Sequence, residues 1–227
     1  MSEATATWQV LLIGGGSGVG KSVAAQDLAK TLQISPMLVD DIRIAIQAVT
    51  SPSQLPALHY FLSTENAVTL PTEAFITGLI GVGRTLIPAL RDVISHHVAV
   101  PTAGRLILEG DGILPELMDG LHLSDVNGAA LVGGATNVRS VFLYEADEAQ
   151  LLRNFVARDR GFNQGATAEQ RQYVHTIWHF GRWVKAEAAR YSLPVVPARP
   201  YATLVQRILA AVASTDEDLR TTNDASA

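Results

Sequence analysis

The sequence contains no cysteine, and this absence excludes several kinds of chemistry. A chain of 227 residues without a thiol forms no disulfide, no thiolate metal site and no cysteine nucleophile. Basic residues are also scarce, with 17 Lys and Arg against 22 Asp and Glu, which gives a formal net charge of −5. This balance argues against nucleic acid as the main partner, because binding to a phosphate backbone needs a basic surface.

Long hydrophobic runs are absent as well. No uninterrupted apolar run approaches the ~20 residues of a membrane span. The first ten residues contain no Lys or Arg, so they do not read as a signal peptide. We therefore expect a cytoplasmic protein without a membrane partner. Hydrophobic residues still make up 48% of the chain, enough for a sizeable core.

Apolar stretches alternate with helical patterns along the chain. Five short stretches read as strands, at 8–14, 36–40, 104–115, 138–146 and 193–198. Amphipathic or apolar spacing predicts helices at 22–32, 72–98, 148–162, 168–192 and 201–213. Strands separated by helices indicate βαβ units. The predicted fold class is therefore α/β, a five-stranded parallel sheet flanked by helices.

The same pattern predicts the domain organisation. We expect one domain over 1–213, followed by a disordered polar tail over 214–227. Residues 41–100 read as a helical insertion between the second and third strands, with a bend near Pro88. Residues 153–168, rich in arginine and glycine, read as a mobile lid.

Residues 15–22 read GGSGVGKS and match the phosphate-loop pattern G-x-x-x-x-G-K-[ST] in full, between a predicted strand and a predicted helix. Glycine lets backbone N–H groups wrap around an anion, and the helix N-terminus that follows favours negative charge. Lys21 is expected to reach the β- and γ-phosphates, and Ser22 to ligate Mg²⁺. The predicted cofactors are thus ATP and Mg²⁺. The predicted nucleotide-binding residues are Gly15, Gly16, Ser17, Gly18, Val19, Gly20, Lys21 and Ser22.

Other motifs narrow the class of phosphate-loop protein. No asparagine is followed by lysine, which excludes the N-K-x-D motif of guanine-specific GTPases, and no transporter signature loop is present. Asp40 follows the second predicted strand, where an acceptor would approach the nucleotide. It is our candidate general base, with Arg43 orienting it or holding an anionic acceptor. The alternative is that Asp40 and Asp41 cap a helix N-terminus.

A second acidic pair follows the third predicted strand. Glu109 is expected to hold a Mg²⁺-bound water or, as a second choice, to act as the base. Asp111 is a candidate for the acceptor site or for the base. The alternative is a structural loop that turns on Gly110 and Gly112, which explains the glycines but not the acids.

Basic residues and one histidine complete the predicted site. Arg158 and Arg160 are candidate catalytic arginines of the lid, because phosphoryl transfer depends on neutralising charge. Arginines on a helix also occur as a solvated face, and Arg153 is the weaker candidate. His59 and Arg84 are candidate acceptor-binding residues within the insertion. With Arg43, Arg84 and Arg91 directed toward it, the acceptor would be anionic.

Beyond the phosphate loop, the chain resembles the 2-phosphoglycerate kinase family and its bacterial relatives among P-loop kinases. The likeness spans roughly residues 9–212 and rests on IGGGSGVGKS, VDDIR, LHYF, ILEGDGILP and RYSLPVVPARP. It implies the nucleoside-monophosphate-kinase type of fold, with a lid. Chloramphenicol phosphotransferase and polynucleotide kinase are similar at one point, where an acid after the second strand serves as base. Asp40 matches it, three residues before Arg43 as in D-x-x-R.

Two departures from that family affect the substrate. Its archaeal members carry an additional N-terminal regulatory domain that has no counterpart in these residues, and segment 116–137 matches no pattern. The expected activity is an ATP- and Mg²⁺-dependent kinase acting on a hydroxyl of a small molecule such as 2-phosphoglycerate. The alternatives are an antibiotic-modifying phosphotransferase of the chloramphenicol phosphotransferase type and a non-catalytic nucleotide-binding regulatory protein.

Overall fold

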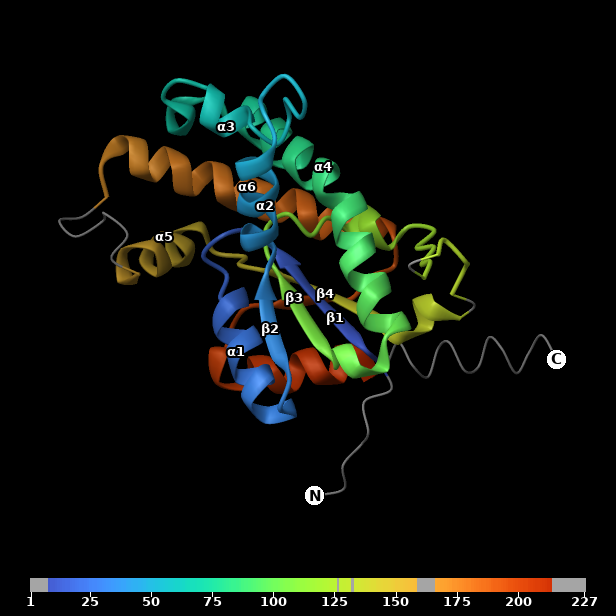
Figure 1. The fold of residues 1–227 in the computed structure, drawn as a ribbon. Helices are drawn as coiled ribbons and strands as arrows, with labels where there is room; N and C mark the ends of the chain where they lie inside the picture. The colour runs from blue at the N-terminus through green and yellow to red at the C-terminus, as the bar shows by residue number, and fades with distance from the viewer. Residues whose placement is uncertain (1–7, 126, 132, 159–165, 214–227) are drawn as a thin grey trace.

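A single parallel sheet lies at the centre of the computed structural model, which describes residues 8–125, 127–131, 133–158 and 166–213 (Figure 1). The strand order is β2–β3–β1–β4–β5. This confirms the predicted α/β fold class. The strands are β1 (Val10–Gly15), β2 (Ser35–Leu38), β3 (Leu106–Glu109), β4 (Val138–Tyr144) and β5 (Val195–Pro197).

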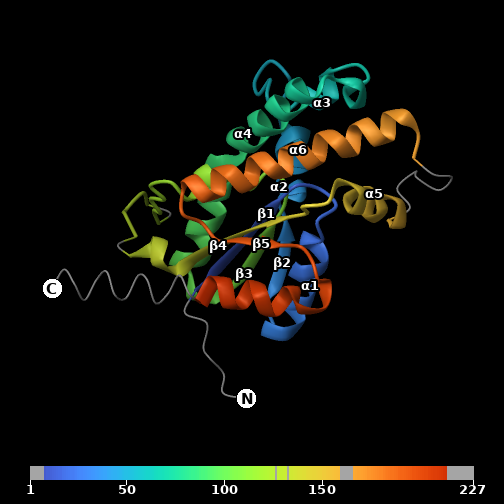
Figure 2. The same ribbon diagram turned by 180° about the vertical axis from the view of Figure 1, so that it is seen from behind.

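Helices cover both faces of this sheet (Figures 1 and 2). They are α1 (Lys21–Leu32), α2 (Val39–Val49), α3 (Tyr60–Ser63), α4 (Thr72–Ala99), α5 (Glu148–Ala157), α6 (Ala168–Arg190) and the C-terminal helical segment Tyr201–Ala213. Short 3-10 turns are η1 (Ala67–Thr69), η2 (Pro101–Ala103), η3 (Pro115–Met118), η4 (Gly134–Asn137) and η5 (Tyr201–Thr203). Segment 116–137, which matched no sequence pattern, contributes η4 and most of η3.

Strand β1 shows how the two helical layers are held. Every residue of β1 is buried, as expected for a central strand of a parallel sheet. Leu11 and Ile13 pack in a core cluster with α1 and the C-terminal segment, whereas Val10 and Leu12 pack in a second cluster with α4 and α6. Alternate side chains of one strand therefore connect both layers to the sheet.

Several predicted boundaries move in the structure. The second strand ends at Leu38 and not at Asp40, because its pairing with β3 ends at the pair Leu38 and Glu109. Helix α2 then begins at Val39 with Leu38 as its N-cap residue. Neither Asp40 nor Asp41 is the N-cap; both lie in the first turn, where a negative charge stabilises the helix dipole. The strand predicted over 104–115 is confined to 106–109.

Helix α4 runs through Pro88 as one element of 28 residues. By length and composition alone it would be able to cross a membrane. Its buried residues, however, recur every three or four positions along one face, as in a helix that packs on a protein core. They are Phe75, Gly78, Val82, Gly83, Leu86, Leu90, Ile94 and Ser95.

Two glycines of α4 test this packing. A Cβ at Gly83 would lie 2.7 Å from Cγ of the buried Leu114, whereas a Cβ at Gly81 would lie 3.7 Å from Cβ of Ala57. Overpacking a core costs about 1–3 kcal/mol, and glycine to alanine inside a helix gains up to about 1 kcal/mol.

We therefore expect Gly83→Ala to lower the free energy of unfolding by about 1–2 kcal/mol, and Gly81→Ala to raise it by up to about 1 kcal/mol. Urea denaturation of both variants is the measurement. Effects of equal sign and size would contradict the close approach of α4 to Leu114.

Candidate active site

The phosphate-loop residues connect β1 to α1 (Figure 1). Gly18 and Gly20 have φ angles of 83° and 92°, in the left-handed region that favours glycine. A Cβ at Gly18 would also lie 2.7 Å from the ring of Phe155 in α5. The glycines of the motif are therefore required by the backbone and by the neighbouring helix.

Lys21 begins α1 and is only 6% exposed. Its Nζ donates a hydrogen bond to the carbonyl of Gly16 at 2.9 Å and forms an ion pair with Asp111. The Asp111 carboxylate also accepts a hydrogen bond from the hydroxyl of Ser17. A buried ammonium group needs such an anionic partner. A phosphate that bound at Lys21 would compete with Asp111 for it.

The register of the sheet brings the acidic residues to the loop. Ile13 of β1, Glu109 of β3 and Leu38 of β2 are neighbours across three strands. The carboxyl ends of these strands therefore meet at one edge, where ligands bind in open α/β sheets. A cavity of about 90 Å³, the phosphate-loop cavity, lies there. It is lined by Ser17, Gly18, Gly20, Lys21, Ser22, Leu38, Asp40, Glu109, Gly110, Asp111 and Arg158.

Glu109 is buried at the end of β3, and this burial raises the pKa of its carboxyl. A hydrogen bond with Ser22 and the charge of Lys21 act in the opposite direction, favouring the carboxylate. Asp111 and Asp40 add like-charge repulsion that raises the pKa further. A divalent cation would relieve that repulsion. Carboxylate and hydroxyl oxygens suit Mg²⁺, so Ser22 and Glu109 fit the predicted metal site.

Of the two predicted lid arginines within the described residues, one lines the phosphate-loop cavity and the other does not. Arg158 follows α5 and lines the phosphate-loop cavity, as a charge-neutralising arginine would. Arg153 instead forms an ion pair with Asp147 at 3.2 Å and does not line this cavity. Arg160 lies outside the described residues.

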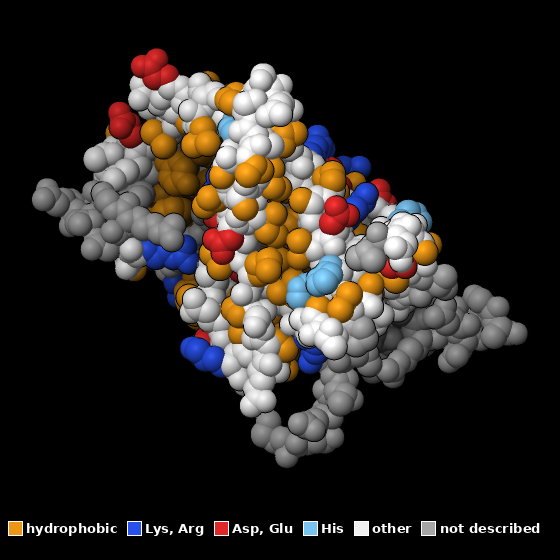
Figure 3. Space-filling model, in the orientation of Figure 1, with side chains coloured by type: hydrophobic (Ala, Val, Ile, Leu, Met, Phe, Trp, Pro, Cys, Tyr) orange, Lys and Arg blue, Asp and Glu red, His pale blue; other side chains and the backbone are white. Residues whose placement is uncertain are grey.

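A second cavity, the interhelix cavity, has a volume of about 280 Å³ and lies among α2, α3, α4 and α6. Figure 3 shows a hollow with hydrophobic side chains in this region, between α2 and the end of the molecule that carries α3. Its lining residues are Val39, Asp40, Arg43, Gln47, Leu58, Phe61, Leu62, Phe75, Leu79, Val82, Leu86, Asp111, Gly112, Tyr173 and Ile177. Asp40 and Asp111 line both cavities.

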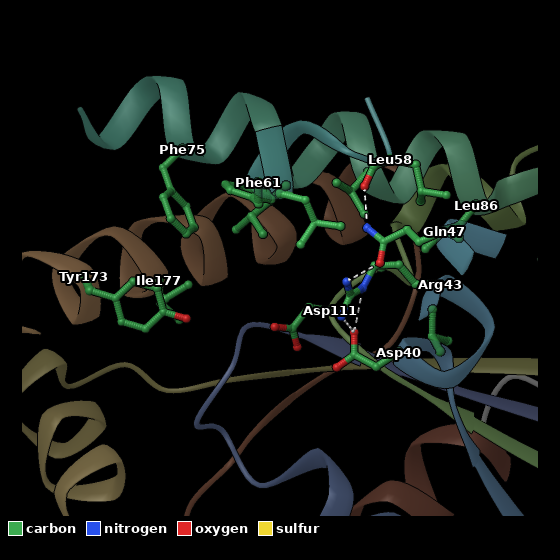
Figure 4. Close-up of a pocket in the computed structure, with 15 residues that line it drawn as sticks. Asp40, Arg43, Gln47, Leu58, Phe61, Phe75, Leu86, Asp111, Tyr173 and Ile177 are labelled. Atoms are coloured by element: carbon green, nitrogen blue, oxygen red, sulfur yellow. Dashed lines mark hydrogen bonds and ion pairs between the residues drawn. The ribbon is translucent and has the colours of Figure 1, made fainter. Parts of the chain in front are cut away.

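Three polar residues of the interhelix cavity, Asp40, Arg43 and Gln47, form one connected chain (Figure 4). The guanidinium of Arg43 donates to Oδ1 of Asp40 at 3.1 Å and to Oε1 of Gln47 at 3.0 Å. Gln47 in turn donates to the carbonyl of Leu58 at 2.7 Å. These contacts fix the orientation of Arg43 and place its charge next to the Asp40 carboxylate.

Two predicted acceptor-binding residues do not line this cavity. Arg84 pairs with Glu116 through two hydrogen bonds of 2.8 and 3.1 Å, on a different part of the surface. His59 is buried, with its Nε2 at 3.0 Å from the hydroxyl of Thr50. Arg91, expected beside them, donates to the carbonyl of Asp119 at 3.4 Å. Each of these side chains has a partner outside the lining of the interhelix cavity that the sequence did not indicate.

Other residues at the site were not predicted. Asn154 donates to the carbonyl of Gly18 at 3.0 Å and to the hydroxyl of Tyr201 at 2.9 Å. The guanidinium of Arg199 lies 4.6 Å from the centre of the Tyr201 ring. These contacts tie the phosphate loop to α5 and η5. The one sequence signal was the stretch ending in ARP, immediately before Tyr201, that contributed to the family resemblance.

The comparisons with known proteins give remote likenesses. No protein-family model and no curated protein matches the chain. A gluconokinase from Sinorhizobium meliloti 1021 is similar at 14% identity and a TM-score of 0.49, over 94% of this chain and 96% of that one. A shikimate kinase from Acinetobacter baumannii in complex with shikimate has 15% identity and a TM-score of 0.47, over 95% and 98%. A shikimate kinase from Aquifex aeolicus has 15% identity and a TM-score of 0.44, over 91% of this chain and 98% of that one.

Likeness of this degree carries no information about the substrate or the reaction of this chain. The resemblance of the sequence to 2-phosphoglycerate kinases is not confirmed by these comparisons. The chemistry therefore has to be inferred from the two cavities and the residues that they share.

The raised pKa of Glu109 has a consequence for stability. The folded protein holds this proton to higher pH than the unfolded chain does. The contribution of Glu109 to stability therefore falls as pH rises from about 4.5, the value of an isolated glutamate, through the raised pKa. We expect Glu109→Gln without nucleotide to melt at a higher temperature than the wild type at pH 7, with the difference vanishing below pH 4.5.

Thermal melts between pH 4 and 8 measure this difference. Glu65→Gln, at an exposed loop position, is the control and should leave the melting temperature unchanged at every pH. A Glu109→Gln protein less stable than the wild type at pH 7 would show that the carboxylate is stabilised in the folded state.

Proposed function

We propose that this protein is an ATP- and Mg²⁺-dependent kinase that transfers the γ-phosphoryl group to a hydroxyl of a small molecule. The observation that carries the proposal is that Asp40 and Asp111 line both the phosphate-loop cavity and the interhelix cavity. Phosphoryl transfer requires an acceptor next to the phosphates, with charged groups positioned between them. A nucleotide-binding site alone has no need of the second cavity.

Each side chain has a distinct role in this proposal. Lys21 and the loop amides hold the phosphates. Ser22 and Glu109 would hold Mg²⁺, which would supply positive charge for the phosphoryl oxygens. Asp40 accepts the proton of the acceptor hydroxyl as its oxygen bonds to phosphorus and the bond from phosphorus to the departing ADP oxygen breaks. Arg43 orients Asp40, and Arg158 adds positive charge at the phosphates.

Asp40 suits the role of base better than Asp111 does. Asp111 is held by Lys21 and Ser17, so its charge serves the phosphate loop. The side chain of Asp40 is 68% exposed, and its single charged partner in the described structure is Arg43. A substrate hydroxyl entering the interhelix cavity can therefore reach Asp40 without breaking a buried ion pair.

Two classes of small molecule are candidates for the acceptor. The family resemblance implies 2-phosphoglycerate or a related anionic metabolite, for which Arg43 is the one arginine lining the interhelix cavity. An antibiotic-modifying phosphotransferase is the second candidate, favoured by the apolar lining of the same cavity. A non-catalytic regulatory protein would leave that cavity and Asp40 without a role.

The nucleotide site is tested by substitution of Lys21. Lys21→Ala should weaken binding of Mg²⁺·ATP by about 10–100-fold, because hydrogen bonds to charged groups contribute about 1.5–3 kcal/mol. Isothermal titration calorimetry is the measurement. Lys30→Ala, an exposed position on the same helix, is the matched control and should bind ATP normally. Unchanged affinity in a folded Lys21→Ala protein would remove the nucleotide assignment.

The general base is tested by Asp40→Asn in a single-turnover assay with saturating ATP and an acceptor alcohol. Transfer should slow by about 10²–10⁴-fold, toward the lower end because the transition state is loose. Stability should change by less than about 1 kcal/mol, since an exposed ion pair contributes little.

Asp41→Asn is the matched control, because Asp41 shares the first turn of α2 but lines neither cavity. It should transfer phosphate at the wild-type rate. A normal rate in Asp40→Asn would assign the base to Glu109 or Asp111 instead.

A further inference from the structure

The lining of the interhelix cavity is mostly hydrocarbon. Nine of its fifteen residues have aliphatic or aromatic hydrocarbon side chains, and Tyr173 contributes a further ring. The polar residues lie on the α2 side and beside the phosphate loop, whereas Phe61 and Phe75 lie on the opposite side (Figure 4). The cavity therefore has a polar side, formed by α2 and Asp111, and an apolar side, formed by Phe61 and Phe75.

Three aromatic rings form the wall on the apolar side. The rings of Phe61 and Phe75 have their centres 4.7 Å apart, and those of Phe75 and Tyr173 lie 5.7 Å apart in an edge-to-face arrangement. These rings come from α3, α4 and α6, so their meeting depends on the tertiary fold. Such a wall favours a flat apolar group, which gains from burial and from ring contacts.

The interhelix cavity offers an anion no free cationic partner. Arg43 is the one cationic residue among its lining residues, and it is already paired with Asp40. The other carboxylate in the lining, Asp111, is paired with Lys21. A phosphorylated hydroxy acid would bring further negative charge toward both carboxylates. Burying such charges without new partners is costly. Arg84 and Arg91, which would have supplied partners, have their contacts elsewhere.

We propose that the acceptor is an uncharged alcohol carried on an apolar body of about the size of one aromatic ring. Its ring packs against Phe61, Phe75 and Leu79, and its hydroxyl lies at Asp40. A polar substituent on the same molecule can hydrogen-bond to Gln47. This inference rests on the proposed kinase function, and it narrows the acceptor to neutral alcohols in place of phosphorylated acids.

The first test compares three probes with the wild-type protein loaded with Mg²⁺ and a non-hydrolysable ATP analogue. 1-Phenylethane-1,2-diol is the neutral probe, mandelate keeps its ring but replaces the hydroxymethyl group by a carboxylate, and 2-phosphoglycerate is the polyanion. Calorimetry should show the diol binding about tenfold or more tightly than either anion. Tighter binding of an anion, or no binding of the diol, would overturn the inference.

A pair of neighbouring variants tests the place of binding. Leu79 and Ile80 are adjacent on α4, both partly buried against the same core cluster, but of the two only Leu79 lines the interhelix cavity. Leu79→Ala should weaken diol binding by about tenfold, in keeping with the loss of a few buried methyl and methylene groups. Ile80→Ala should leave binding within about twofold of the wild type.

Thermal melts of both variants are the control for correct folding. Equal losses of diol affinity in the two variants, or no loss in Leu79→Ala, would overturn the assignment of the apolar body to this wall.

Product analysis separates this inference from the proposed function. With Mg²⁺·ATP, ³¹P NMR should detect a phosphate ester of the diol. Leu79-dependent binding of the diol without any ester would overturn the kinase function and keep the preference of the cavity. An ester formed from 2-phosphoglycerate and not from the diol would keep the kinase and overturn the inference.

Discussion

The ion pair between Lys21 and Asp111 connects the parts of this site. A lysine at the start of α1 that is almost completely buried needs an anion beside it, and Asp111 supplies one from the loop after β3. That requirement keeps the β3 loop against the phosphate loop. Because Asp111 also lines the interhelix cavity, the same contact places the acceptor side of the molecule next to the phosphate side. The adjacency of the two cavities therefore depends in part on the neutralisation of Lys21 by Asp111.

Burial at this edge of the sheet also destabilises the charged form of Glu109. Its carboxyl group is buried at the end of β3, close to Asp40 and Asp111, and this position raises its pKa. A protein selected for stability alone would place an amide or a hydrocarbon there. Carboxylates gathered at the carboxyl ends of parallel strands are instead an arrangement suited to a cation and phosphates. The electrostatic strain is therefore located where the proposed chemistry takes place.

The sequence allowed the fold class and the phosphate loop to be predicted, because both depend on local patterns. The strand β1 is an uninterrupted apolar run, and the motif that follows it specifies its own backbone. Arg84 and His59 were expected at the acceptor site, but neither lines the interhelix cavity, because each contacts a partner outside it. Arg84 contacts Glu116, 32 residues further along the chain, and no periodicity indicates such a pair. The contact between Phe75 and Tyr173 in the cavity wall could not be predicted either, because these residues are far apart in the sequence.

Helix α4 has a consequence for how the acceptor site could diversify. At about 1.5 Å per residue its 28 residues form a rod of about 42 Å. One end carries Phe75, Leu79 and Val82 in the cavity wall, and the other carries Leu90 and Ile94 in the core cluster between α4 and the sheet. Phe75, Leu79 and Val82 line the interhelix cavity and do not line the phosphate-loop cavity. Substitutions along one face of this single helix would change the preference for the acceptor without changing the residues that bind phosphate. New acceptor specificities would therefore be accessible by single mutations.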